Sequence, residues 1–135
     1  MTEKTAVTPS GHTTPPALFS HGVRKGNVLQ VAGQVGFLPV TAPGATPAVV
    51  GPGLPEQVRQ TLDNVHAVLD AGGASWEDVV MLRVYLTDTA HFAEFNEVWD
   101  AYFAGRVTVP AARTTVYVGL PAGLLVEIDA LAVLG

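Results

Sequence analysis

The chain ends with the stretch PAARTTVYVGLPAGLLVEIDALAVLG, residues 110–135. Two runs rich in β-branched residues flank the turn sequence GLPAG, and this pattern predicts a hairpin with a short loop. Arg113 and Glu127 lie at equal distances on either side of Leu120. A hairpin centred on Leu120 would place them opposite one another, with Thr115 on the same face as Arg113.

An arginine in such an apolar stretch needs an anion. Burying a cation is costly unless it is paired. The guanidinium of Arg113 forms a planar fork that fits a carboxylate, which either Glu127 or a ligand could supply. Because perturbed ion pairs are often structural, spacing alone favours an ordinary cross-strand pair over a ligand site. Both interpretations stay open at this point.

The composition predicts one oligomeric domain. A length of 135 residues is typical of a single domain. Charged residues make up only 14% of the chain, against a usual share of about a quarter. So little charge on a small protein indicates that part of its surface is buried between subunits. No signal core or membrane-spanning run is found, so we expect a cytoplasmic protein without membrane contact.

Several classes of chemistry lack their motifs. The net charge of −5 and the absence of a basic stripe disfavour nucleic-acid binding. With no cysteine, thiol chemistry is excluded. There is no phosphate-binding glycine loop and no nucleophile elbow, and the histidines lack zinc spacing, which disfavours a metal site around His66. What remains is a site that acts through positioning, charge and one carboxylate, and such a site suits a reactive substrate.

Hydrophobic periodicity predicts an α+β fold with the element order β-β-α-β-α-β-β. Both helices have one apolar face, so they can cover one side of a mixed sheet. We expect a flexible lead-in at residues 1–16 and a single domain at residues 17–135. Within that domain, the expected strands are residues 17–21, 28–35, 79–87 and the two arms of the terminal hairpin. The expected helices run from Pro55 to the glycines at 72–73, and from a cap at Asp88 or Thr89 to Gly105.

The buried faces follow from the same pattern. The apolar stripe of the first helix comprises Val58, Leu62, Val65 and Leu69, and that of the second comprises Phe92, Phe95, Trp99, Tyr102 and Phe103. In the strand at 79–87, the expected core face comprises Val80, Leu82, Val84 and Leu86. Asn96 lies at the edge of the second stripe, where exposure is the simpler expectation. Gly33 inside a strand indicates either a bulge or the close approach of a ligand or another backbone.

Several motifs resemble one known family. They are PAARTTV at 110–116, LP at 120–121 and VEIDALA at 126–132, with GNVL at 26–29, AGQV at 32–35, QTLDNV at 60–65 and FAEFN at 92–96. In order and spacing they are similar to the reactive intermediate deaminase family (RidA, YjgF-like). The resemblance extends from about Leu18 to Val133.

This resemblance implies a fold like that of the bacterial monofunctional chorismate mutase, assembled as a barrel-like homotrimer with active clefts between subunits. Family members hydrolyse 2-imine and 2-enamine acids, such as 2-iminopropionate and 2-aminoacrylate, to 2-oxo acids and ammonia. They use no cofactor and no metal.

The resemblance also assigns roles by position. Arg113 matches the arginine that grips the substrate carboxylate, and Glu127 matches the acidic residue near the attacking water. The positions that match the pocket wall are Phe19, Ala32, Gly33, Asn96 and Thr115. Three of these depart from the usual residues, because Phe19 replaces a tyrosine, Ala32 often a serine and Thr115 often a cysteine.

Two other functions remain as alternatives. The missing tyrosine hydroxyl at Phe19 is compatible with a non-catalytic trimer that binds 2-oxo acids or related carboxylates. A ribonuclease or translation inhibitor, as related proteins have been described, is disfavoured by the acidic balance of the chain.

Overall fold

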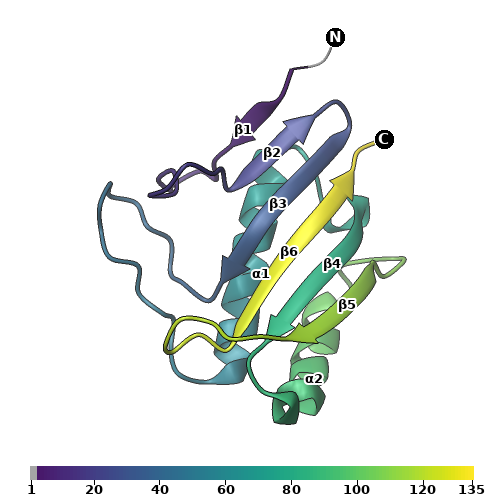
Figure 1. The fold of residues 1–135 in the computed structure, drawn as a ribbon. Coiled ribbons are helices and arrows are strands. Elements are labelled where there is room, and N and C mark those ends of the chain that lie inside the picture. Colours follow the sequence, from purple (N-terminus) through teal and green to yellow (C-terminus); the bar gives the residue numbers. More distant parts are fainter. Residues whose placement is uncertain (1–2) are drawn as a thin grey trace.

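The fold is one mixed sheet with both helices on the same face (Figure 1). A computed structural model describes residues 3–135. The sheet has the strand order β1-β2-β3-β6-β4-β5. Its strands are β1 (Thr5–Val7), β2 (Gly22–Lys25), β3 (Val28–Val35), β4 (Val79–Leu86), β5 (Ala112–Tyr117) and β6 (Val126–Val133), and its helices are α1 (Leu54–Ala71) and α2 (Phe92–Phe103). The predicted α+β class, with two helices on one side of a mixed sheet, is confirmed.

Two helical crossovers determine which strands become neighbours. β4 and β5 pair in parallel and are joined through α2, whereas β3 and β4 both pair antiparallel with β6. β3 and β4 therefore run parallel to each other, joined through α1, with β6 inserted between them. Strand–helix–strand connections of this kind place the helix on one face of the sheet with a fixed handedness. Within residues 3–135, the opposite face carries no helix (Figure 1).

The terminal hairpin is a wrong prediction. β5 and β6 do not pair, because β4 lies between them and hydrogen-bonds to both. The segment from Val118 to Leu125 crosses the end of β4 and is held there by two backbone bonds. Val118 N–H donates to the Leu86 carbonyl at 2.9 Å, and Thr87 N–H donates to the Leu125 carbonyl at 3.2 Å. A turn sequence joined to two apolar runs fixes a change of direction, but it does not fix which strand fills the space between them.

The start of the chain also differs from the prediction. The expected strand at residues 17–21 is not formed, and β2 begins at Gly22, just after that range. Thr5–Val7, inside the expected flexible lead-in, pairs antiparallel with β2 and forms one edge of the sheet. Val7 is buried, with 7% of its surface exposed. An apolar side chain that reaches the core therefore anchors this short edge strand.

Helix α1 is the centre of the hydrophobic core. Its start follows the predicted signals, because Pro55 lies in the first turn and the Glu56 carboxylate accepts a 2.7 Å hydrogen bond from Gly53 N–H. The predicted stripe is confirmed, since Val58, Leu62, Val65 and Leu69 are all fully buried. Each such side chain stabilises the fold by about 1.5–3 kcal/mol through burial.

Two buried polar residues of α1 hold the loops at the ends of β3 and β6. Gln57 donates to the carbonyls of Gly51 and Gly123 and accepts from Leu125 N–H, at 2.8–2.9 Å. Asn64 donates to the carbonyl that ends β3, Val35, at 2.9 Å. These bonds satisfy loop backbone groups that would otherwise be buried without partners. They fix the approach of the chain to β6.

The second helix and its strand match the prediction except at single positions. Phe95 and Tyr102 of α2 are buried, but Phe92 is 41% exposed. In β4, Val80 is 49% exposed, because the register with β6 shifts between Val79 and Met81. This irregularity places Val79 in the core instead.

We predict that Leu62→Ala destabilises the protein by about 2–5 kcal/mol, because it removes a fully buried side chain and leaves a cavity beneath the sheet. Chemical denaturation at a fixed protein concentration measures this loss. Arg59→Ala, an exposed position of the same helix, is the matched control and should change the free energy of unfolding by less than about 0.5 kcal/mol. Similar losses in the two variants would contradict the assigned core.

Candidate functional site

Arg113 lies on the helix side of the sheet, beneath α2. It belongs to β5, the strand at one free edge of the sheet. In β5 it pairs with Leu82 of β4, whose side chain faces the core. Its Nη2 donates a 2.9 Å hydrogen bond to the side-chain oxygen of Asn96 on α2. Asn96 is therefore not a freely exposed residue, as the sequence had favoured, but a partner of this guanidinium.

Aromatic rings surround the same guanidinium. Its central carbon lies 4.9 Å from the ring centre of Trp99, 5.4 Å from that of Phe95 and 5.9 Å from that of Phe92. Ring faces of this kind attract a cation. Burial lowers the pKa of Arg113, and the nearby Asp100 carboxylate partly offsets this effect. The group stays charged at neutral pH, because an arginine side chain is not deprotonated in proteins.

The arginine keeps unused hydrogen-bonding capacity. Among residues 3–135, the ion pair that the structure contains joins Arg83 to Asp129, so no carboxylate lies within 4.0 Å of Arg113. A guanidinium has five N–H donors, of which Asn96 takes one. Thr115, two residues along the same face of β5, has a buried hydroxyl without a partner in the described part of the chain. We call Arg113, Asn96, Thr115 and the three rings the arginine site.

Glu127 lies on the other face of the sheet, the one without helices. In β6 it pairs with Tyr85 of β4 and with Val35 of β3. Its carboxylate lies directly over Gly33, where an added Cβ would come within 2.3 Å of the Glu127 Oε2 atom. Burial raises the pKa of Glu127, and the negative charge of Asp129 raises it further. The register between β3 and β6 shifts between Val31 and Gln34, so Gly33 lies in a bulge, one of the two alternatives that the sequence left open, and it also lies close to the Glu127 side chain.

The strand register separates the two charged residues. Arg113 pairs with Leu82 and Glu127 with Tyr85, and these partners are three residues apart on β4. Because successive strand residues alternate between faces, the two side chains leave the sheet on opposite sides. The expectation that they share a face is wrong. A single chain does not bring Arg113 and Glu127 into one site.

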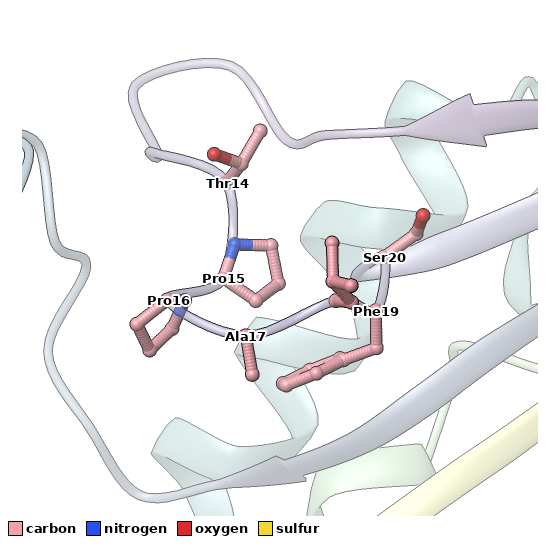
Figure 2. Close-up of a pocket in the computed structure, with 7 residues that line it drawn as sticks. Thr14, Pro15, Pro16, Ala17, Phe19 and Ser20 are labelled. Atoms are coloured by element: carbon pink, nitrogen blue, oxygen red, sulfur yellow. The ribbon is translucent and has the colours of Figure 1, made fainter.

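The remaining predicted residues are Ala32, which lies in β3, and Phe19, which lies in the loop before β2. Ala32 precedes Gly33 in β3, and its N–H donates to the His21 carbonyl at 2.8 Å. Phe19 belongs to the preceding loop, where it is 57% exposed. Figure 2 shows this loop, from Thr14 to Ser20, which curls around a hollow lined by its own residues. The structure assigns no role to that hollow.

Comparison with known proteins identifies the family. A sequence model for the family described as endoribonuclease L-PSP matches residues 11–134. The RutC family protein SSO3206 of Saccharolobus solfataricus is 41% identical over 119 residues, which cover 87% of this chain and 88% of that protein. The chain belongs to the RidA/YjgF (L-PSP, RutC) family.

Two further proteins similar to this RidA/YjgF-family chain carry a named activity or a bound small molecule. The 2-iminobutanoate/2-iminopropanoate deaminase of Escherichia coli K12 is 36% identical over 116 residues, covering 85% of this chain and 86% of that protein. The crystal structure of E. coli TdcF with bound serine superposes with a TM-score of 0.80 at 29% identity, covering 97% of this chain and 99% of that chain. The deaminase name and the serine belong to those two proteins.

Sequence reasoning missed a polar network next to Glu127 in this RidA/YjgF-family chain. Arg83 Nε donates to Asp129 Oδ1 at 2.7 Å, and the Tyr85 hydroxyl donates to Asp129 Oδ2 at 2.8 Å. The sequence already placed Arg83 and Tyr85 on the non-core face of β4. Their partner could not be found without the β4–β6 register, which follows only from the strand order.

Residues 3–135 contain neither a membrane-spanning helix nor a metal-binding cluster in this family member. None of the helices in residues 3–135 is long and apolar enough to cross a bilayer. In the same residues, no three His, Cys, Asp or Glu side chains lie close enough together to hold a metal ion.

Proposed function

We propose that the protein hydrolyses 2-imine and 2-enamine acids, such as 2-iminopropionate and 2-aminoacrylate, to 2-oxo acids and ammonia. The observation that carries the proposal is the arginine site, a half-buried cation with unused donors and no carboxylate partner among the described residues. The substrate carboxylate would complete it, held by two parallel N–H···O bonds. The deaminase name of the E. coli relative supports the same chemistry.

Glu127 would act on water. In hydrolysis, the water oxygen bonds to the imine carbon as its protons pass to nitrogen, and the C–N bond then breaks to release ammonia. A carboxylate positioned beside that carbon can orient the water and accept its proton. Burial raises the pKa of Glu127, which makes it a better base than an exposed glutamate. General-base assistance of this kind contributes about 10²–10⁴-fold.

The two halves would meet between subunits. Within one chain, Arg113 and Glu127 lie on opposite faces, so a complete site requires Arg113 of one chain and Glu127 of another. The free edge of β5, next to Arg113, and the helix-free face that carries Glu127 are both open to a second copy. We propose the homotrimer that the family resemblance implies, with clefts between its subunits. The low charge content of the chain agrees with subunit burial.

The direct test is turnover. 2-Iminopropionate is generated continuously by an amino-acid oxidase, and pyruvate and ammonia are measured in the presence and absence of the protein. We expect hydrolysis to accelerate in proportion to protein concentration, without added metal or cofactor. A rate equal to the spontaneous rate at every protein concentration would refute the proposal.

A second function is supported by one observation. The TdcF structure holds serine, so a relative binds a small amino acid in the crystal. A non-catalytic trimer that binds carboxylate metabolites would use the same arginine site. Calorimetry with 2-oxobutyrate separates the two functions, because saturable binding without any turnover of the imine would favour the binding protein.

Gly33→Ala tests the close approach beside Glu127. We predict a loss in kcat/KM of about tenfold to a hundredfold, because the new methyl group would push the carboxylate out of position. Gly119→Ala, where an added Cβ meets nothing within 4 Å, is the matched control and should keep full activity. Full activity in Gly33→Ala would show that the position of the carboxylate is not critical.

A further inference from the structure

Four polar residues form a square on the open face of the two central strands. Arg83 of β4 is the direct cross-strand partner of Asp129 on β6, and Tyr85 is the direct partner of Glu127. The diagonal of the square is closed by the hydrogen bond from the Tyr85 hydroxyl to Asp129 Oδ2 at 2.8 Å. Direct and diagonal neighbours on one sheet face are close enough for their side chains to interact.

Asp129 is the fixed member of this square. Its side chain is only 12% exposed, and each of its oxygens accepts one bond, from Arg83 Nε at 2.7 Å and from Tyr85. Glu127 lies two residues before it on the same face, at a backbone separation of about 7 Å. Two carboxylates at this separation repel each other, and the repulsion favours protonation of one of them.

We propose that the Arg83–Asp129 pair is a positioning network for Glu127, in which Arg83 neutralises Asp129 so that Glu127 stays ionised and available to act on water. This inference rests on the proposed function, in which Glu127 is the water-handling residue. Arg83 and Asp129 would not touch the substrate. They act through the charge and the place of Glu127.

Among the described residues, Asp129 is the charged group that shifts the pKa of Glu127. From β3, the neighbours of Glu127 are Gly33 and Val35, which do not titrate. From β4 they are Arg83 and Tyr85, and from β6 the neighbour is Asp129. Burial and Asp129 are the two causes that raise the pKa of Glu127, while Asp129 in turn is held by Arg83. Arg83 is therefore the cation that limits how far the negative charge of Asp129 can raise the pKa of Glu127.

The network predicts that the pKa of Glu127 shifts in opposite directions when Arg83 and Asp129 are replaced one at a time. Arg83→Gln leaves the charge of Asp129 uncompensated and should raise the pKa of Glu127 by about half a unit to one unit, a range that corresponds to one charge at about 7 Å in a partly solvated site. Asp129→Asn removes the repelling charge and should lower the pKa by a similar amount. The double variant Arg83→Gln/Asp129→Asn removes both charges, so its Glu127 pKa should lie near that of the unmodified protein.

The experiment is a carboxyl-carbon NMR titration of the full chain, with the Glu127 signal assigned by its loss in Glu127→Gln. Arg83→Lys keeps the charge and should keep the pKa, and Arg59→Gln removes an equal charge on the helix layer and should not move it. Opposite shifts in the two single variants, cancelled in the double variant, would establish the network. Equal shifts in Arg83→Gln and Arg59→Gln, or shifts of the same sign in both network variants, would overturn it.

This readout does not depend on turnover. If the protein hydrolyses no imine, the proposed function fails, while the titration still decides whether the network exists. If the protein is active, the acid limb of the pH profile of kcat/KM should move with the Glu127 pKa, to higher pH in Arg83→Gln and to lower pH in Asp129→Asn. A titration without these shifts in an active enzyme would overturn the network and leave the proposed function standing.

Discussion

Arg113→Ala is expected to lower kcat/KM for 2-iminopropionate by about a hundredfold or more, since it removes the group that holds and orients the substrate carboxylate. The side chain is half-buried, and the groups around it are an amide oxygen and three aromatic rings, none of which replaces a cation. Without it, the carboxylate would meet a site with Asp100 nearby and no opposing charge. Initial rates of pyruvate formation, over a range of substrate concentrations, measure the loss.

Arg113→Lys is the sharper variant. It keeps the charge but replaces a planar fork by a single ammonium, which cannot form two parallel bonds to a carboxylate. We therefore expect most of the activity to be lost in this variant as well. Arg106→Ala is the matched control, because Arg106 is an exposed arginine that lies over the Tyr102 ring, outside the arginine site. Equal rates for Arg113→Ala, Arg113→Lys and the unmodified protein would remove Arg113 from the mechanism.

Local sequence patterns predicted those helices and strands that are defined by their own apolar repeat or by a capping residue at one end. The strand at 28–35 and the helix ending at Gly72 follow from β-branched runs, an apolar repeat and a glycine stop, and the structure confirms them. Asp88, one of the two expected caps, caps the short turn Thr89–His91 by accepting from Ala90 N–H at 2.8 Å, and α2 itself begins later than expected, at Phe92. In each case the signal lies within the element itself, so no distant partner was needed.

Pairing between strands could not be predicted in the same way. The sequence near Leu120 is compatible with a hairpin, but β4 offers two edges, one taken by β5 in parallel and one by β6 in antiparallel orientation. The choice depends on the α2 crossover, which is a property of the whole chain. The edge strand Thr5–Val7 was missed for a similar reason, because a three-residue strand is stabilised by its partner more than by its own sequence.

The site shows both limits. Arg113, Glu127 and Asn96 were predicted from the residues and the family resemblance, and the structure gives each a distinct environment. The placement of Arg113 and Glu127 in one hairpin was wrong, because the observed register aligns Arg113 through Leu82 with Ala130. Ala130 is three residues from Glu127, and an odd offset puts side chains on opposite faces of the sheet. Arg83 and Asp129 lie 46 residues apart in sequence, so only the folded register shows that they form an ion pair.

Glu127→Gln is the second substitution for which we expect a large loss of activity. The amide keeps the shape of the side chain but cannot accept a proton from water, so we expect kcat to fall by about 10²–10⁴-fold. Stability should not fall with it. The folded-state pKa of Glu127 is raised, so ionising this group at neutral pH opposes folding. The stability that the group contributes is present below its unfolded-state pKa and is lost as the pH rises through its folded-state pKa. A neutral glutamine removes that cost, and thermal melting at pH 7 checks that the fold is kept.

Mixing the two inactive variants decides where the residues meet. If each cleft takes Arg113 from one chain and Glu127 from the next, trimers assembled from equal amounts of Arg113→Ala and Glu127→Gln chains contain some intact clefts. Around a ring of three chains, every mixed trimer has one cleft in which both residues are intact, so about a third of the clefts in mixed trimers should be active. Co-expressed chains, separated from the single variants by distinct tags, provide the sample. No mixture of these chains restores both residues to one polypeptide, so regained activity can arise only at a site shared between subunits. Activity no higher than that of either variant alone would contradict such a shared site.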